Sequence, residues 1–295
     1  MAVKTEFDQF IVEEAKKYQG IGTPVKAGLL ERLLVRKAGT GRLHPNPDDE
    51  FCNPEVGPNN KIIGDYIYMI RQHGSLQPDS WTEPIIVEKI RPEGYMILNG
   101  HHRWAAAIRV GLNPVPIKIV NLTQETDIEK MIRESKHDRR VTLDLDEVVF
   151  CRDEDDLADP PLPFPYNRLY NVRIRRGVPA LLHFLAKEGY DIWVYSAKYY
   201  SIDSVRSVLR HYSVKVDGII TGTARKEKNL DEMKKRTEEL FRNQYAETLH
   251  IERDNVLRTL RDTKTYEDFP VEAEPADWSR TVMGIVKKLQ KDETK

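Results

Sequence analysis

The stretch Val141-Thr142-Leu143-Asp144-Leu145-Asp146-Glu147-Val148-Val149-Phe150 is an apolar run that carries two aspartates one residue apart. Ionised carboxylates are rarely buried without a partner or a metal, so this pattern is unusual for a strand. If Val141 to Leu143 form a buried parallel strand, Asp144 and Asp146 lie at its carboxyl end, where open α/β sheets place their ligands. Two carboxylates there suit Mg²⁺, and one of them can attack phosphorus. A plain strand end followed by an acidic turn would give the same letters, so the choice depends on the rest of the chain.

Strand and helix patterns alternate after this stretch, which is typical of a doubly wound α/β sheet. The next strand, Asp191-Ile192-Trp193-Val194-Tyr195-Ser196, ends in a hydroxyl, and a later one, from Thr248, ends in the acids Glu252 and Asp254. Because a strand, a helix and a strand form a right-handed βαβ unit, we expect Asp144, Asp146 and Ser196 at one edge of the sheet. Residues 151–170 contain a run of acids and several prolines, which predicts an irregular loop or flap.

Over residues 139–290 these patterns resemble the haloacid dehalogenase (HAD) superfamily of phosphohydrolases. Asp144-Leu145-Asp146-Glu147-Val148 matches the first motif of the family, Asp-x-Asp-x-Thr/Val, and Trp193-Val194-Tyr195-Ser196 matches the second. The third motif is a lysine before or at a helix, for which Lys226 and Lys228 are both candidates. The fourth is normally a pair of aspartates, whereas this chain has Glu252-Arg253-Asp254. Glu252 aligns with the first acid, and Asp254 is the alternative.

The resemblance implies a phosphatase mechanism for these residues. Asp144 would attack phosphorus and form an aspartyl-phosphate, and Asp146 would protonate the leaving oxygen and then activate water. Ser196 and one lysine, Lys226 or Lys228, would hold the phosphoryl oxygens. Mg²⁺ would be bound by Asp144, the Asp146 carbonyl and either Glu252 or Asp254. No separate cap domain is apparent, so the implied fold is a doubly wound parallel sheet with a minimal cap.

A second informative segment, Asn99-Gly100-His101-His102-Arg103, lies where a predicted strand runs directly into an alanine-rich helix that stops at Gly111. Asn99 can cap this helix, and Gly100 lets the backbone approach a ligand. Free N–H groups together with His101, His102 and Arg103 would bind an anion. A capped helix with a solvated basic first turn is the alternative, although basic residues oppose the helix dipole at that end.

Residues 29–122 resemble the ParB/sulfiredoxin superfamily, an α+β fold whose members carry a Gly-x-x-Arg-type sequence at such a helix start. Members include partition-protein CTPases, sulfiredoxin and free-serine kinases, and the resemblance implies that the helix start holds the phosphates of a nucleotide, ATP, ADP or CTP. The Asn-Gly-His-His-Arg form is similar to the kinase-like branch, in which an acid after a Pro-containing loop assists phosphoryl transfer. Glu50, or Asp49, is the corresponding candidate. His101 stands where sulfiredoxin has its catalytic cysteine, which argues against sulfiredoxin chemistry.

With 295 residues the chain is long enough for two domains, and we expect one over residues 1–138 and the other over residues 139–295. The formal net charge of -1 argues against sequence-independent binding of nucleic acid. Two cysteines fit a reducing compartment. No signal peptide and no apolar run of membrane-spanning length is apparent, so the sequence predicts a cytoplasmic protein without membrane contact.

The leading hypothesis is a Mg²⁺-dependent phosphomonoester hydrolase with an N-terminal nucleotide- or phosphate-binding domain. An alternative is a bifunctional enzyme with a nucleotide-dependent kinase around Glu50 and a phosphatase around Asp144. A nucleotide-switched DNA-binding partition-type protein is a weaker alternative, because no helix-turn-helix pattern follows residue 122. The irregular fourth motif is also compatible with a phosphatase fold that has lost its activity.

Overall fold

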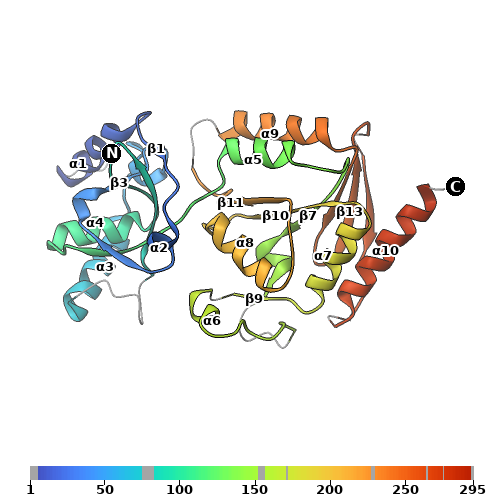
Figure 1. Ribbon diagram of the computed structural model, residues 1–295. Coiled ribbons are helices and arrows are strands. Elements are labelled where there is room, and N and C mark those ends of the chain that lie inside the picture. Colours follow the sequence, from blue (N-terminus) through green and yellow to red (C-terminus); the bar gives the residue numbers. More distant parts are fainter. Residues whose placement is uncertain are drawn as a thin grey trace. The chain divides into compact units, whose positions relative to one another are not determined.

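The computed structural model describes residues 6–74, 83–151, 157–170, 172–226, 230–263, 265–274 and 276–293. The chain forms two compact units (Figure 1). The first consists of residues Met1–Leu122 and Ala224–Leu230, and the second of Thr123–Thr223 and Asp231–Lys295. Each unit has its own main sheet and its own hydrophobic core.

The first unit is an α+β fold around a mixed sheet. Its strands follow the order β2-β6-β4-β5-β3, and β1 pairs with the C-terminal end of β4. Its elements are α1 (Glu6–Tyr18), β1 (Thr23–Pro24), α2 (Leu29–Arg32), β2 (Arg36–Ala38), β3 (Leu43–Pro45), α3 (Asn60–His73), β4 (Ile85–Arg91), β5 (Tyr95–Asn99), α4 (His101–Val110) and β6 (Val115–Ile119). The helical spacing of apolar residues over 5–18 and 62–73 accounts for α1 and α3, and the turn sequence Pro92-Glu93-Gly94 separates β4 from β5.

Small and bulky side chains alternate in the core of this unit. Ala105, Ala106 and Ala107 of α4 are all fully buried, and their small side chains let α4 approach its neighbours, including α3, closely. Trp104 fills the space beside these alanines, and its indole N–H donates to the Thr40 carbonyl at 3.1 Å. The helix start at residue 101 is therefore held rigidly against the core.

The prolines and acids of residues 43–52 are typical of a polar loop, but the segment is ordered. It begins with β3, which pairs in parallel with β5 at the edge of the sheet, and ends in a 3₁₀ turn at Glu50–Cys52. An edge position tolerates Pro45, because the missing N–H is not needed by a further strand. His44 is buried beneath the stacked ring of Tyr18, at 3.6 Å between ring centroids.

The second unit is a three-layer α/β fold. Its main sheet has the order β11-β10-β7-β12-β13-β14, in which β11, β10, β7 and β12 are parallel and β13 and β14 are antiparallel additions. Its elements are α5 (Glu125–Arg133), β7 (Arg139–Asp144), β8 (Phe150–Cys151), α6 (Tyr166–Leu169), β9 (Arg173–Ile174), α7 (Val178–Lys187), β10 (Asp191–Ser196), α8 (Ile202–His211), β11 (Gly218–Thr221), α9 (Leu230–Gln244), β12 (Glu247–Ile251), β13 (Asn255–Leu260), β14 (Tyr266–Pro270) and α10 (Trp278–Glu293). The predicted parallel sheet is present.

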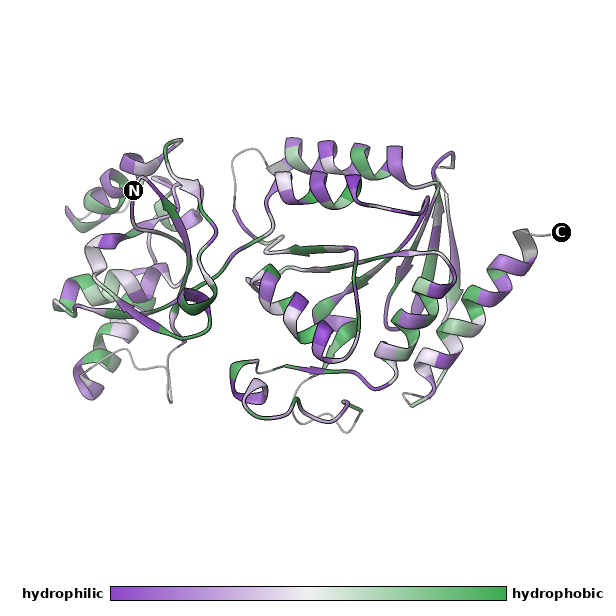
Figure 2. Cartoon of the chain, viewed as in Figure 1, coloured by the Kyte–Doolittle hydropathy of each residue, from purple (hydrophilic) through white to green (hydrophobic). Residues whose placement is uncertain are grey.

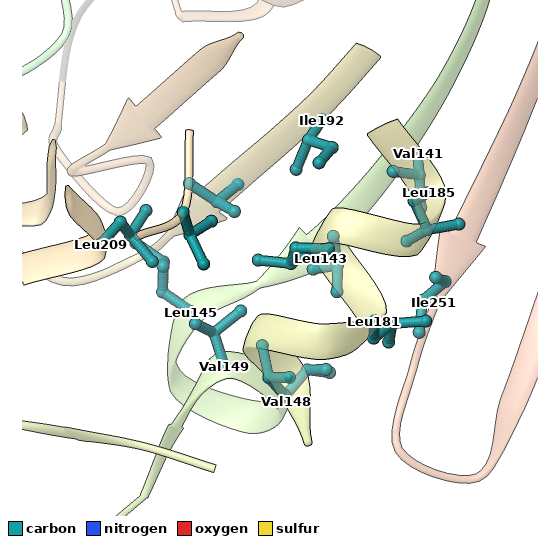
Figure 3. Close-up of a cluster of buried hydrophobic side chains, with 14 of the residues drawn as sticks. Val141, Leu143, Leu145, Val148, Val149, Leu181, Leu185, Ile192, Leu209 and Ile251 are labelled. Atoms are coloured by element: carbon teal, nitrogen blue, oxygen red, sulfur yellow. The ribbon is translucent and has the colours of Figure 1, made fainter. Parts of the chain in front are cut away.

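Helices cover both faces of this sheet. On one face α7, α8 and α10 pack against the alternate residues Val141 and Leu143 of β7, and on the other face α5 and α9 pack against Trp193 of β10 (Figure 1). Figure 2 shows hydrophobic and hydrophilic residues on both the strands and the helices of this unit, and the central strand β7 itself carries Arg139, Arg140 and Asp144. Figure 3 shows that Leu145 and Val149, from the turn after β7, extend the same core. The turn that carries the aspartates is thus anchored by apolar side chains.

The division between the units lies after Leu122, earlier than the boundary expected near residue 138. Residues 123–138 are strongly charged, as solvated connectors commonly are. However, the buried face of α5, formed by Ile128, Met131 and Ile132, packs with Trp193 and Phe241 of the second unit. One apolar stripe on a charged helix is enough to attach it to a sheet.

In the described part of the chain no helix combines the length and the apolar character that crossing a membrane requires.

Candidate functional site

Asp144 ends β7 and caps the turn that follows it. Its Oδ1 accepts the backbone N–H of Asp146 at 2.7 Å and that of Glu147 at 2.9 Å. The turn, Leu145–Val149, is a single π-helical turn whose Leu145 and Val149 side chains are fully buried. Such turns are rare in proteins, and those that occur are often found at functional sites. The alternation of acids and apolar residues therefore buries one side of the turn and presents both carboxylates on the other.

Asp146 is the best-coordinated carboxylate of this edge. Its Oδ2 accepts from Ser196 Oγ at 2.5 Å, and its Oδ1 accepts from Tyr200 OH at 2.9 Å and lies 2.8 Å from Lys198 Nζ. Burial raises the pKa of Asp146, but the hydrogen bonds from Lys198, Ser196 and Tyr200 and the charge of Lys198 outweigh it, so the pKa is lowered. Asp146 is thus held as a carboxylate at neutral pH.

The donors to Asp146 come from the end of β10 and the segment after it. Parallel pairing of β10 with β7 sets Tyr195 opposite Asp144, so Ser196 lies one step further along the same edge. The Ser196 side chain is fully buried, and its Oγ also accepts the N–H of Lys198 at 2.9 Å. As the sequence predicted, the sheet brings Asp144, Asp146 and Ser196 together.

Glu252 reaches the same edge from β12. Ile251 pairs with Leu143, so the residues that follow them, Glu252 and Asp144, stand level on neighbouring strands. Besides burial, the charges of Asp144 and Glu252 raise the pKa of Tyr195. Asp254 lies within the turn to β13 that is closed by the backbone hydrogen bond from Glu252 N to Asn255 O. Of the two alternatives, Glu252 is level with Asp144.

The two predicted lysines have other positions. Lys226 belongs to the first unit, where its Nζ lies 3.5 Å from Glu50 Oε1. Lys228 lies outside the described residues. The lysine beside Asp146 is instead Lys198, which was not predicted, because the third motif places its lysine before or at a helix. A lysine two residues after the strand-ending Ser196 was the available signal.

Among the described residues, no group of three or more His, Cys, Asp or Glu side chains is arranged to bind a metal ion. The predicted ligands Asp144 and Glu252 therefore form a pair of carboxylates at most, with Asp146 engaged by its own donors.

In the first unit, α4 begins directly after β5, as predicted, but its cap differs. Gly100 occupies the N-cap position with φ 102°, and no side chain caps the helix. The Asn99 side chain instead accepts from Arg103 Nη2 at 2.7 Å. The positive φ at Gly100 favours glycine, and an added Cβ would also lie 3.0 Å from Arg103 Nη2, so the arginine side chain would have to shift.

The histidines at this helix start act as acceptors. His101 Nε2 accepts the Asn46 N–H at 3.2 Å, and His102 Nε2 accepts the Asn59 N–H at 3.2 Å. Burial lowers the pKa of His101 to about 4 and also lowers that of His102. The two imidazoles are therefore neutral and not the cations expected of a basic first turn, because a ring nitrogen that accepts a backbone N–H carries no proton.

Arg103 is likewise turned into the protein. Its side chain is buried and donates to the Glu83 carbonyl and to Asn99. Burial lowers the pKa of its guanidinium. Arg103 therefore orders the backbone around the helix start, and the backbone N–H groups of the first turn of α4 are the remaining features suited to an anion.

The predicted acids Asp49 and Glu50 lie in the 3₁₀ turn. Asp49 Oδ1 accepts the Phe51 N–H at 2.9 Å, which makes it a capping residue. The Glu50 side chain is 71% exposed and faces Lys226. A cavity of about 160 Å³ in this unit lies between residues 46–48, which precede this turn, and Arg225 and Lys226.

Residues 59–136 match the family model of the ParB N-terminal domain. The matched segment contains α4 with Gly100 to Arg103, and it does not include Asp49 or Glu50. Among solved structures, the C-terminally truncated chromosome-partitioning protein ParB from Caulobacter crescentus, complexed with CTP-γ-S, is 29% identical. That match covers 36% of this chain and 56% of the ParB chain, with a TM-score of 0.24. No curated protein matches the chain.

The ParB-like part of the sequence prediction is thus confirmed for residues 59–136. The HAD resemblance of the second unit stays a prediction.

Proposed function

We propose that the second unit is a Mg²⁺-dependent phosphomonoester hydrolase that acts through an aspartyl-phosphate on Asp144. The observation that supports this most is the arrangement of Asp146, which lies beside Asp144 and is held by Ser196, Lys198 and Tyr200. A nucleophile, an acid–base group and a cationic group at one sheet edge are the parts that phosphoryl transfer requires.

Asp144 is oriented for nucleophilic attack. Two backbone N–H groups fix its Oδ1, which leaves Oδ2 as the attacking oxygen. In the first step the Asp144 Oδ2–phosphorus bond forms, the bond from phosphorus to the leaving oxygen breaks, and Asp146 gives a proton to that oxygen. In the second step water attacks phosphorus and gives a proton to Asp146, the bond between Asp144 Oδ2 and phosphorus breaks, and phosphate leaves with Asp144 restored as a carboxylate.

Lys198 and Ser196 would control the charge during these steps. Lys198 is two-thirds exposed, so its ammonium group can turn from Asp146 toward a phosphoryl group. This movement removes the charge that lowers the pKa of Asp146, and it lets Asp146 take up the proton needed by the leaving oxygen. Ser196 stays in hydrogen-bond contact with Asp146 and keeps it oriented.

Magnesium is the cofactor that the HAD resemblance implies. Mg²⁺ is commonly bound by one or two carboxylates and retains several waters, so the pair Asp144 and Glu252 with the Asp146 carbonyl fits it. The ion would supply positive charge to the phosphoryl oxygens.

The same proposal assigns nucleotide binding, with ATP, ADP or CTP, to the first unit. It is supported by the match of residues 59–136 to the ParB N-terminal domain and by the N-terminus of α4, whose first-turn N–H groups suit a phosphate. The exposed Glu50 beside Lys226 keeps the bifunctional kinase and phosphatase as a second candidate, because a carboxylate can act as a general base toward a hydroxyl.

Phosphatase activity is tested with p-nitrophenyl phosphate and Mg²⁺. Asp144→Asn should reduce phosphate release by at least about a thousandfold, because an amide is a poor nucleophile. Glu147→Gln is the matched control, because this substitution removes the same negative charge from an exposed residue three positions away. Equal activity of the wild-type protein and Asp144→Asn would reject the proposal.

Nucleotide binding is tested by equilibrium dialysis with ATP, ADP and CTP. Gly100→Ala should abolish binding, because the added Cβ both strains the backbone and meets Arg103 at the start of α4. Gly111→Ala introduces similar strain at the other end of α4, with φ 71° and nothing within 4 Å, and should bind as the wild type does. The absence of binding by the wild-type chain to all three nucleotides would contradict this part of the proposal.

A further inference from the structure

A cavity of about 570 Å³ lies in the second unit at the edge of the sheet opposite to the carboxylates. It is lined by Arg140 near the start of β7, by Thr248 near the start of β12, by Phe241 from the last turn of α9, and by Tyr245, which directly follows α9. Arg140 and Asp144 are four residues apart on one strand, so their Cα atoms are separated by about 13 Å. Cavities of this size commonly bind small molecules.

Arg140 is a partly buried cation without an anionic partner. Its Nε donates to Thr248 Oγ1 at 2.9 Å, and its Cζ lies 3.9 Å from the centre of the Phe241 ring. No carboxylate pairs with Arg140 among the residues that the structure describes. The aromatic contact compensates part of the charge, but buried charges are normally paired. The remaining guanidinium N–H groups are therefore available to an anion.

The positive charge of Arg140 affects the residues around it. Besides burial, the charge of Arg140 lowers the pKa of His250 to about 4. Thr248 accepts a hydrogen bond from Arg140, which leaves its own hydroxyl hydrogen to donate into the cavity. Donors and positive charge are thus concentrated on the inner wall.

Two further arginines, Arg242 and Arg261, line the cavity and are exposed. Arg261 Nε donates to the Tyr245 carbonyl at 3.3 Å, which fixes its direction. Two exposed acids, Glu238 and Asp262, also line the cavity, so the lining contains one cation more than it contains anions. In the described ranges neither acid forms an ion pair with these arginines.

We propose that this cavity binds a phosphorylated small molecule, with Arg140 paired to its phosphate and with Arg242 and Arg261 at the mouth. A planar guanidinium pairs with phosphate through two parallel hydrogen bonds, and it binds such groups more specifically than an ammonium does. The site shares no residue with the Asp144 site and does not depend on phosphatase activity.

The probe is inorganic pyrophosphate, titrated into the full chain by calorimetry without divalent cations at low ionic strength. Arg140→Met should weaken binding at least about tenfold and Arg242→Gln about threefold, because charge-assisted hydrogen bonds are lost. The matched control is Arg280→Gln, which removes an exposed arginine of α10 outside the cavity and should leave the affinity unchanged. Lys198→Met should also leave it unchanged, since it alters only the Asp144 site.

Arg140 packs on Phe241, so a second variant guards against misfolding of Arg140→Met. Thr248→Val keeps the shape of the side chain and removes the hydroxyl, and it should weaken pyrophosphate binding severalfold. The inference is overturned if the wild-type chain does not bind pyrophosphate, if Arg242→Gln and Thr248→Val bind it with the wild-type affinity, or if Lys198→Met abolishes binding.

Discussion

Lys198 Nζ lies 2.8 Å from Asp146 Oδ1, on the side of the carboxylate next to Tyr200. Lys198 follows Ser196, the last residue of β10, by two positions, so the end of this strand and the residues directly after it provide both the hydroxyl and the cation. One short segment thus determines both the orientation and the charge state of Asp146.

Lys198→Met should reduce kcat/KM for an aryl phosphate by about a hundredfold, because a cation next to the transferred group is lost. The variant should also shift the pH profile. Protonation of the leaving oxygen needs protonated Asp146, so kcat/KM falls as the pH rises above the pKa of Asp146. Lys198 lowers that pKa, and its removal should move this limb to higher pH. Lys226→Met is the control and should change neither value.

Glu252→Gln should raise the Mg²⁺ concentration for half-maximal activity at least about tenfold, because a carboxylate ligand level with Asp144 is lost. Asp254→Asn, in the turn beyond it, should leave this concentration unchanged. Titration of phosphatase activity with Mg²⁺ measures both. If Asp254→Asn raised this Mg²⁺ concentration and Glu252→Gln did not, the metal ligand would be Asp254.

Gly218→Ala should destabilise the second unit by about 3 kcal/mol, as expected for an overpacked core. A Cβ at Gly218 would lie 2.0 Å from Trp193 Cε3, and Trp193 is buried between the sheet and α9. Urea unfolding followed by tryptophan fluorescence measures the change in free energy. Gly284→Ala in α10 is the control, since its Cβ would meet nothing within 4 Å and should stabilise the helix by about 0.5–1 kcal/mol.

The first unit should lose stability as the pH falls from 6.5 toward 4. Burial lowers the pKa of folded His101 to about 4, whereas an unfolded histidine titrates near 6.5. Between these values the unfolded chain binds more protons, so protonation favours unfolding, by roughly 1–3 kcal/mol. His101→Gln keeps an acceptor for the Asn46 N–H and cannot titrate, so its stability should depend less on pH. Hydrogen exchange of the α4 amides measures this, and equal pH dependence of both proteins would contradict the assignment.

Much of the second unit follows from local patterns. The apolar strand before Asp144, the hydroxyl that ends β10 and the acids after β12 were all predictable, because parallel pairing puts strand ends at one edge. Lys198 was not predictable in the same way, since its contact with Asp146 depends on how the chain turns after Ser196.

The first unit shows a different limit. The position of α4 and its glycine start were predictable, but the charge of His101 was not. Residue type alone suggested a cation, whereas the protonation state depends on burial and on the Asn46 N–H, which comes from a distant segment. The attachment of α5 to the second sheet likewise depended on an apolar stripe hidden in a charged sequence.

Residues 224–230 belong to the first unit, although the chain reaches them only after three parallel strands of the second. There the buried Arg225 forms an ion pair with the buried Glu88, at 3.1 Å between Nη1 and Oε2. During synthesis on the ribosome, the ion pair between Glu88 and Arg225 therefore cannot form until most of the second unit has emerged. A fragment that ends at Leu122 would lack this arginine, so the two units cannot be separated by a single cut without removing a charge from the core of the first.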